Sequence, residues 1–205
     1  MRSRAEAYSG PAGRDSRGIP RYVGEAQLSL LSRIRLWFDS YFHPALAAGT
    51  RAELHFGALA EQKRWVLERV DQSRGGLAKY RAVAGRSVKR GDYICRNCNN
   101  AEIELKCKTL YHNDNCFYIE YREIKRLQEM QRITGSRVVF ALMERDGSGV
   151  RHGSLRMFLL DFLMGTFDYQ AGRLYNKRMK CVRVPLKYTL PGFEVLRKLG
   201  GTGDA

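Results

Sequence analysis

The sequence of 205 residues contains no apolar run long enough to span a bilayer, and no secretory signal stands at its start. The first absence excludes a membrane-spanning helix, so we expect no membrane partner. The five cysteines are an odd number, and with no secretory signal they favour a reduced protein over a disulfide framework. We therefore expect an intracellular location, whether cytoplasmic, nucleoid-associated or in a viral factory.

Acidic residues are scarce. The sequence has 21 Asp and Glu against 36 Lys and Arg, which gives a formal net charge of +15. A field of this sign attracts polyanions and makes their binding depend steeply on salt. Nucleic acid is therefore the leading class of partner. The basic residues extend from Arg2 to Lys198, so charge alone does not define a groove.

A second Cys-x-x-Cys pair is also missing, because Cys95 and Cys98 form the only one. A zinc site built on this pair would need further ligands from downstream, where the candidates are Cys107, His112 and Cys116. Buried free thiols are the commoner explanation for such cysteines. A zinc-dependent binding module that uses Cys95 and Cys98 stays open as an alternative.

The composition divides the chain into four segments. Residues 1–25 are rich in Arg, Ser and Gly without apolar periodicity, which predicts a disordered basic arm. Its acidic residues argue against an organelle transit peptide, although organelle import stays open. Residues 26–50 form an N-terminal helical extension, whose helix at 26–42 has an aromatic stripe suited to the core or to a homodimer contact. The core is expected at 51–145, and 146–205 is a C-terminal extension packing on it.

Periodicity predicts the elements of the core and of the extension. In the core we expect a helix at 51–70, a strand at 77–84, a strand pair within 91–109, a helix at 121–134 and a buried strand at 137–143. A helix that connects two strands implies a parallel or mixed sheet, so the expected fold class is α/β with helices flanking a central mixed sheet. In the extension we expect a helix at 154–164, a strand at 181–188, a helical turn at 193–199 and a frayed end.

The stretch 91–109, GDYICRNCNNAEIELKCKT, predicts a hairpin around which the core is organised. Its second strand alternates, with Glu104 and Lys106 on one face and Cys107 on the apolar face. Folding back would bring Asp92 beside Glu104, with Lys106 about 6.5 Å further along the strand. Two carboxylates and an ammonium can hold Mg2+ and orient a water. An ordinary solvated strand face with alternating charges is the other interpretation.

The order helix, three strands, helix, strand resembles the core of the PD-(D/E)XK nuclease superfamily, and within it the Holliday-junction resolvase-like members. The matching stretches are FGALAEQKRWVLERV, GDYIC, IELKCK and YREIKRLQEMQRITGSRVVFALME. The resemblance implies a restriction-endonuclease-like αβββαβ core, here with an extra N-terminal helix and a C-terminal helix and strand extension. Gly91 stands where the family name has proline, and Cys95-x-x-Cys98 is not part of the pattern.

The resemblance also implies roles for individual residues. Asp92 and Glu104 would be metal ligands, and Lys106 would position or activate the attacking water. Glu61 matches the helix carboxylate that some members use as a further metal ligand. Glu102 lies on the same strand face as Glu104, so the sequence leaves open which of the two matches the family's glutamate.

From these features we expect a Mg2+- or Mn2+-dependent endodeoxyribonuclease that selects branched or flap DNA, with RNA left open as a substrate. Phosphodiester hydrolysis needs a cation to neutralise developing charge and a water made nucleophilic, which fits the three residues. The residues expected to contact nucleic acid are Lys125, Gln128, Gln131, Arg90 and Lys108. The alternative from another class is a basic nucleic-acid-binding or assembly protein that keeps the fold without cleaving.

Overall fold

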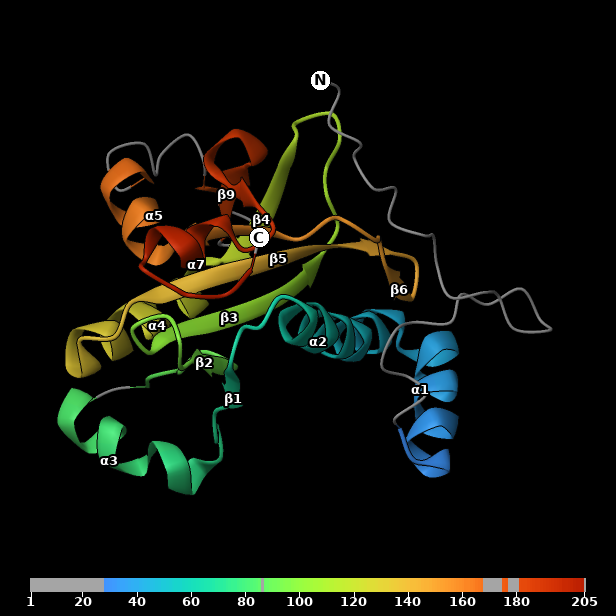
Figure 1. The fold of residues 1–205 in the computed structure, drawn as a ribbon, viewed down its shortest axis with the longest axis horizontal. Coiled ribbons are helices and arrows are strands. Elements are labelled where there is room, and N and C mark those ends of the chain that lie inside the picture. Colours follow the sequence, from blue (N-terminus) through green and yellow to red (C-terminus); the bar gives the residue numbers. More distant parts are fainter. Residues whose placement is uncertain (1–27, 86, 168–174, 177–180, 205) are drawn as a thin grey trace.

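The computed structural model describes residues 28–85, 87–167, 175–176 and 181–204, so the expected basic arm lies outside the described residues. Its main sheet has the strand order β1 (Leu67–Arg69), β2 (Tyr93–Cys95), β3 (Ala101–Lys108), β5 (Val138–Asp146), β7 (Arg156–Leu159) and β10 (Leu190–Pro191), with β6 (Gly149–Val150) paired to β5. A second sheet has the order β4 (Cys116–Glu120), β9 (Cys181–Pro185) and β8 (Tyr175–Asn176). The helices are α1 (Leu30–Phe42), α2 (Pro44–Gln62), α3 (Arg74–Ala84), α4 (Tyr121–Thr134), α5 (Leu160–Phe167) and α7 (Glu194–Lys198). Figure 1 shows the long strands β3 and β5 crossing the middle of the molecule.

The main sheet is mixed, as expected. β3 and β5 are parallel, and α4 lies between them in sequence, whereas β2 pairs with β3 antiparallel. Gly135 ends α4 in the left-handed conformation that favours glycine, with φ at 69°. The predicted fold class, a central mixed sheet flanked by helices, is therefore confirmed.

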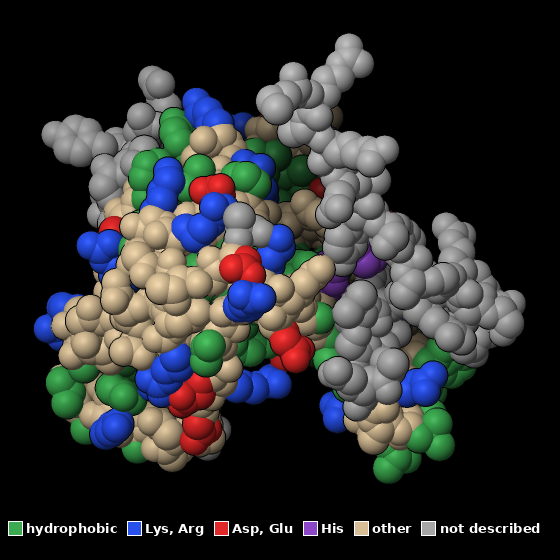
Figure 2. Space-filling view, in the orientation of Figure 1, with side chains coloured by type: hydrophobic (Ala, Val, Ile, Leu, Met, Phe, Trp, Pro, Cys, Tyr) green, Lys and Arg blue, Asp and Glu red, His purple; other side chains and the backbone are tan. Residues whose placement is uncertain are grey.

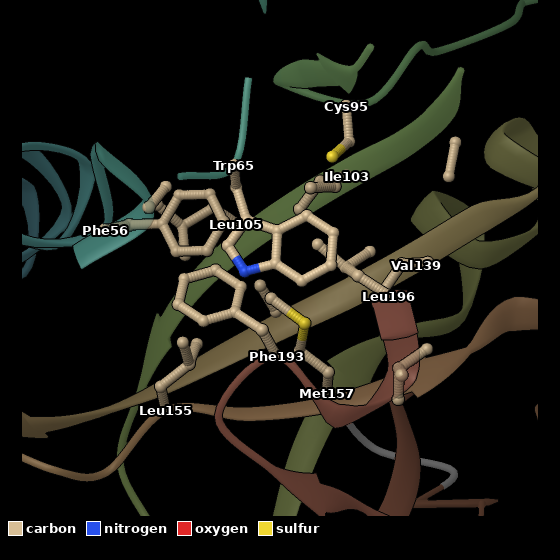
Figure 3. Packing of buried hydrophobic residues seen from close by; sticks show 14 of the residues in the cluster. Phe56, Trp65, Cys95, Ile103, Leu105, Val139, Leu155, Met157, Phe193 and Leu196 are labelled. Carbon is tan, nitrogen blue, oxygen red and sulfur yellow. The ribbon is translucent and has the colours of Figure 1, made fainter. Parts of the chain in front are cut away.

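The two faces of the sheet have different cores. On one face the apolar residues of β3 pack with α2, α7 and the indole of Trp65, whose ring stacks on Phe193 with centroids 5.7 Å apart (Figure 3). On the other face, β5 packs with α4, α5 and the second sheet. Since side chains alternate along a strand, Ile103 and Leu105 face α2, while Glu104 and Lys106 face α4. Catalytic chemistry at Glu104 must therefore be sought on the α4 side.

The strand predicted at 77–84 is wrong, because these residues belong to α3. Ser73 caps this helix by accepting a hydrogen bond from the N–H of Gly76 at 3.1 Å, and Gly85 ends it with φ at 63°. Leu77 packs against α4, together with Tyr80 and other residues spaced by helical turns. The apolar residues of LAKYRAVA thus form a short stripe along one side of a helix.

The second helix also differs from its predicted bounds. It begins at Pro44, which suits the first turn because proline has no N–H to leave unpaired, and it ends at Gln62. Arg64 then takes a positive φ of 57°, and the chain turns into β1, which pairs with β2. β1 therefore supplies the first of the three core strands, in place of the strand expected at 77–84.

The C-terminal part completes the main sheet. The helix expected at 154–164 is divided into β7 and α5, because Met157 and Phe158 each fill the core on a different face, which only a strand permits. The strand expected at 181–188 ends at Pro185, and a 3-10 turn follows (Leu186–Tyr188). The helical turn predicted at 193–199 is confirmed by α7.

The end that was expected to fray is docked instead. The N–H of Thr202 donates to the carbonyl of Asn97 at 3.1 Å, and that of Asp204 donates to the carbonyl of Lys63 at 2.7 Å. A Cβ on Gly203 would lie 2.3 Å from the Trp65 ring, so the backbone of this tail packs directly on the indole. Residues 200–204 therefore cover part of the core.

The surface carries two features that bear on partners. Lys and Arg are spread over the face seen in Figure 2 and do not gather in one groove. The aromatic stripe of α1 is largely exposed, and within that helix only Leu36 is buried, so the stripe does not belong to this chain's core. Among the described residues, no helix combines the length and apolarity needed to cross a membrane.

Candidate active site

The antiparallel pairing of β2 with β3 brings the predicted acidic residues together. Tyr93 pairs with Ile103 and Ile94 with Glu102, so one step along the same register places Asp92 opposite Glu104. The N–H of Asp92 donates to the carbonyl of Ile103 at 2.7 Å. Asp92 and Glu104 therefore lie on neighbouring chain segments at the edge of the hairpin.

Glu104 is fully buried, and its two carboxylate oxygens have different surroundings. Oε1 contacts the ammonium of Lys106 at 2.5 Å and also that of Lys89. Oε2 is buried and has no hydrogen-bond partner among the described residues. A buried carboxylate oxygen without a donor is costly, and such an atom is a candidate ligand for a cation.

Glu123, in the first turn of α4, completes a closed ion-pair network. Its Oε1 contacts Lys106 at 2.7 Å and also contacts Lys89. Each lysine thus touches both Glu104 and Glu123, and none of these four side chains is more than one-fifth exposed. We call Lys89, Glu104, Lys106 and Glu123 the ion-pair network.

Burial and charge shift the network's pKa values in opposite directions. Burial raises the pKa of Glu104 to about 7 against the attraction of Lys106, and the negative charge of Asp92 adds to the rise. Burial would also raise the pKa of Glu123, but Lys106 and Lys89 outweigh it and lower that pKa to about 2. Burial would lower the pKa of Lys106, but the two glutamates raise it well above its usual value. Lys106 is therefore held as an ammonium.

Asp92 lies at the wall of a pocket of about 660 Å³, which Arg69, Gln72 and Lys89 also line. Gln72 donates to Oδ1 of Asp92 at 2.8 Å, and the backbone N–H of Leu105 donates to Oδ2 at 2.8 Å. Both donors fix the orientation of the carboxylate. The pocket provides room for a substrate group next to Asp92.

The donor set suits a hard divalent cation. Asp92 and Glu104 offer carboxylate oxygens, one of which lacks any other partner among the described residues. In the part of the chain that the structure describes, no group of three or more His, Cys, Asp or Glu could hold a metal ion. Mg2+ accepts one or two carboxylates and keeps waters or phosphate oxygens in its other positions, so two ligands are compatible with it.

The fold is similar to that of a Holliday junction resolvase. This resolvase comes from the archaeal hyperthermophile Archaeoglobus fulgidus, and the match has a TM-score of 0.44 at 14% identity. It covers 73% of this chain and 95% of the resolvase. Neither a family model nor the sequence of a curated protein matches the chain. A likeness this distant carries no argument about function, which has to come from the site itself.

Two predicted acidic candidates lie outside the network. Glu61 is exposed in the last turn of α2, on the opposite sheet face from Lys106, so the structure does not bring it to the site. Glu102 pairs with Arg90, and its Oε2 accepts the N–H of Gly91 at 3.0 Å. The sequence left open whether Glu102 or Glu104 is the site residue. Glu102 forms a structural ion pair with Arg90, whereas Glu104 contacts Lys89 and Lys106.

The predicted nucleic-acid contacts have different environments. Arg90 is held by Oε1 of Glu102 through Nε at 3.0 Å and Nη2 at 2.8 Å, and Gln131 bonds to Asp161 and to the N–H of Val138. Both side chains therefore brace the fold. The other three are better placed to meet a ligand: Lys125 is exposed, Lys108 is half-buried, and Gln128 lines a second pocket of about 380 Å³.

Sequence reasoning missed three members of the site: Lys89, Glu123 and Gln72. Lys89 lies between the predicted elements at 77–84 and 91–109, and Glu123 lies in the predicted helix at 121–134, whose periodicity marks only apolar positions. Glu123 and Ile124 are adjacent, so the amphipathic pattern already placed Glu123 at the edge of the buried face. No local signal marked Gln72, because it meets Asp92 only through the tertiary fold.

The zinc alternative meets a packing obstacle. Cys95 and Cys98 are fully buried in the core on the α2 face, and the Cys98 thiol donates to the carbonyl of Leu196 at 3.2 Å. Cys107 packs against the same core, as its place on the apolar strand face predicted. The Cys95 and Cys98 thiols are therefore both buried and free, which agrees with the interpretation of these cysteines as core residues.

Proposed function

We propose that this protein is a metal-dependent nuclease that hydrolyses DNA phosphodiester bonds, with Asp92, Glu104 and Lys106 as its catalytic residues. The observation that carries the proposal is the buried Oε2 of Glu104, which has no partner among the described residues although Oε1 of the same carboxylate has two. Asp92 stands opposite Glu104 and opens onto a pocket. A cation coordinated by both carboxylates would satisfy this oxygen.

Each residue has a role that follows from its surroundings. Asp92 and Glu104 would hold Mg2+ or Mn2+, which when bound neutralises charge on the phosphate and makes a water nucleophilic. Lys106 remains charged because two glutamates raise its pKa, so it orients and stabilises negative charge and does not abstract a proton. Asp92 is held in place by Gln72 and by the N–H of Leu105, which keeps its position fixed as a ligand.

The substrate class follows from charge. A net charge of +15 supports binding to a long polyanion, and the spread of basic residues suits a substrate that covers much of the surface. We propose branched or flap DNA as the substrate and cleavage within a strand. A homodimer is proposed through the exposed aromatic stripe of α1, and light scattering of the purified protein tests it by the mass in solution.

Cleavage of defined substrates tests the proposal. Labelled linear, flap, four-way and single-stranded DNA, with an RNA strand for comparison, are incubated with the protein and Mg2+ or Mn2+, with and without chelator. We expect metal-dependent internal cleavage of the flap or four-way substrate. Lys106→Met should abolish cleavage, whereas Lys198→Met, at an exposed position of α7, serves as the control. Absence of cleavage on every substrate with either metal would refute the proposal.

A nucleic-acid-binding protein that does not cleave is the second candidate, and one observation favours it. Lys89 and Lys106 together already neutralise Glu104 and Glu123, so the network is complete as a structural ion-pair cluster. This candidate predicts salt-dependent DNA binding that neither metal nor chelator alters. Calorimetric titration with Mn2+ separates the two, because only the nuclease binds the cation at Glu104.

A further inference from the structure

Lys89 has an unusual position for a residue outside the regular elements. It lies in the coil between α3 and β2, yet its ammonium reaches into the network and contacts Oε1 of both Glu104 and Glu123. The side chain is 20% exposed. Lys89 is therefore a nearly buried cation on a coil residue, between Val88, which is buried against α3 and α4, and Arg90, which is held by Glu102.

Lys106 contacts the same two carboxylates but is anchored differently. It belongs to β3, which is paired with β2 on one side and β5 on the other. The backbone N–H of Lys89 donates to the carbonyl of Arg126 in α4 at 3.4 Å. Lys89 also lines the pocket beside Asp92, so its ammonium can leave the network by rotation of its long side chain alone, whereas Lys106 is not among the residues that line this pocket.

The pocket beside Asp92 gives the Lys89 ammonium a place to go. Lys89 and Asp92 line this pocket together with Arg69. A phosphate bound there would meet the Lys89 and Arg69 cations on a wall that also includes Asp71, and Arg69 contacts Glu53 at 2.8 Å. One side chain can therefore reach two anions, Glu104 inside the network and a phosphate in the pocket.

A cation bound at Asp92 and Glu104 would decide by its charge which of these two anions the Lys89 ammonium contacts. With Glu104 ionised, as cation binding requires, Asp92, Glu104 and Glu123 carry three negative charges against the two ammoniums of Lys89 and Lys106. A divalent cation at Asp92 and Glu104 would reverse this local balance and repel the ammonium that touches Oε1 of the same carboxylate. Of the two lysines, Lys89 is the one that lines the pocket into which its ammonium can turn.

We propose that Lys89 is an exchangeable counter-ion of Glu104: a divalent cation displaces its ammonium, which then binds the DNA phosphate in the pocket beside Asp92. This inference rests on the proposed metal site. It adds a substrate-binding residue and a metal-dependent rearrangement to the proposed function. Metal binding and phosphate binding are coupled through this one side chain.

Lysine acetylation followed by mass spectrometry tests the displacement in the unmodified chain. The protein is treated with acetylating reagent with and without Mn2+, and the rate at each lysine is compared. We expect Mn2+ to raise the acetylation rate of Lys89 roughly tenfold as it leaves its ion pairs, while Lys106 stays protected. The exposed Lys125 on α4 is the internal control, and its rate should not change. In Glu104→Gln the effect of Mn2+ on Lys89 should disappear.

Calorimetric titration with Mn2+ provides the second measurement. Lys89→Met removes the competing cation, so we expect it to bind Mn2+ roughly tenfold more tightly than the wild type and to bind flap DNA more weakly in the presence of metal. Lys125→Met is the matched control and should leave Mn2+ affinity unchanged.

The outcomes separate the inference from the proposed function. Mn2+ binding by the wild type with no change in Lys89 acetylation, or with unchanged affinity in Lys89→Met, would leave the metal site standing and overturn the role of Lys89. No Mn2+ binding by the wild type would overturn both.

Discussion

The backbone N–H of Leu105 donates to Oδ2 of Asp92 at 2.8 Å, which fastens the carboxylate in front of β2 to the strand that carries Glu104. The bond fixes the position of Asp92 relative to β3 without involving either carboxylate oxygen of Glu104. Since Gln72 holds the other oxygen of Asp92, the position of this carboxylate does not depend on a bound ion. The site is therefore preorganised on its Asp92 side and adjustable on its Lys89 side.

Glu104→Gln removes the charge that would hold the cation while keeping the shape of the side chain. We expect cleavage to fall by at least about 100-fold, because the electrostatic stabilisation of the reacting phosphate is lost. DNA binding should change little, since it rests on many Lys and Arg. Initial cleavage rates and a binding titration at fixed salt measure the two effects.

Glu61→Gln is the control for that variant, since Glu61 was a candidate ligand from the sequence and is exposed at the end of α2. It should retain wild-type cleavage. A loss in Glu61→Gln equal to that in Glu104→Gln would contradict the placement of the metal ligands.

Replacing both Cys95 and Cys98 by Ser should destabilise the protein, because each sulfur atom is fully buried in the apolar core. Burying a hydroxyl in such surroundings costs about 1–3 kcal/mol for each position. Urea unfolding of the double variant measures the change in the free energy of unfolding. Cys107→Ser, at a half-buried position, is the control and should cost less.

Zinc content distinguishes this packing effect from metal binding. Elemental analysis of the native protein should find no stoichiometric zinc. One zinc per chain, lost together with folding in the double variant, would favour the zinc-dependent module.

His55 should make the stability fall as the pH drops from about 6.5 to about 4. Burial, and the neighbouring ring of His152 at 4.9 Å, lower the pKa of His55 to about 4. In this window the unfolded chain binds a proton at His55 and the folded chain does not, so stability is present above the unfolded pKa and is lost progressively below it, by about 3 kcal/mol at pH 4. His55→Gln should flatten this part of the curve of melting temperature against pH.

His43→Gln is the matched control for the pH experiment, because the exposed side chain of His43 makes no cap hydrogen bond at the start of α2. This variant should keep the wild-type loss of stability. An unchanged slope in His55→Gln would assign the pH dependence to another group.

Gly203→Ala should undock the C-terminal tail, because the added methyl group would lie 2.3 Å from the Trp65 ring. Trp65 would then become exposed, and its fluorescence should shift to longer wavelength when measured with Trp37→Phe in both proteins. Gly57→Ala in α2 is the control, since a Cβ there has no atom within 4 Å and alanine favours a helix. An unshifted spectrum in Gly203→Ala would mean that the tail tolerates the methyl group.

The sequence was sufficient for the parts of the fold that rest on local pattern. β3, α4 with its glycine cap and the parallel β5 were all predicted, because each has strong periodicity or a clear stop. The predictions were wrong where a short apolar pattern fits both the period of a strand and the period of a helix. Residues 77–84 satisfy both an alternating and a helical spacing, and the cap at Ser73 decides for the helix. β7 was hidden because a strand buried on both faces has no alternation to detect.

The candidate site was predictable only in part, for a related reason. Asp92, Glu104 and Lys106 lie within one hairpin, so their proximity follows from strand geometry. Lys89 and Glu123 reach the same point from a coil and from a helix, and only the packing of α4 on the sheet brings them there. Glu61 lies apart from these residues, and the sequence alone does not show which face of the sheet α2 covers.

The docking of α7 and the tail on Trp65 also determines the order in which parts of the protein can fold during synthesis. Phe193, Leu196 and Gly203 close the core over residues from the first half of the sequence, so the α2 face of the sheet cannot be covered until residues 193–203 have left the ribosome. Until then the nascent protein exposes Trp65, Cys95 and Cys98, a surface open to chaperones and to aggregation. The hairpin that holds Asp92 and Glu104 is made of local contacts and can form earlier, so the two carboxylates would come together before the core is complete.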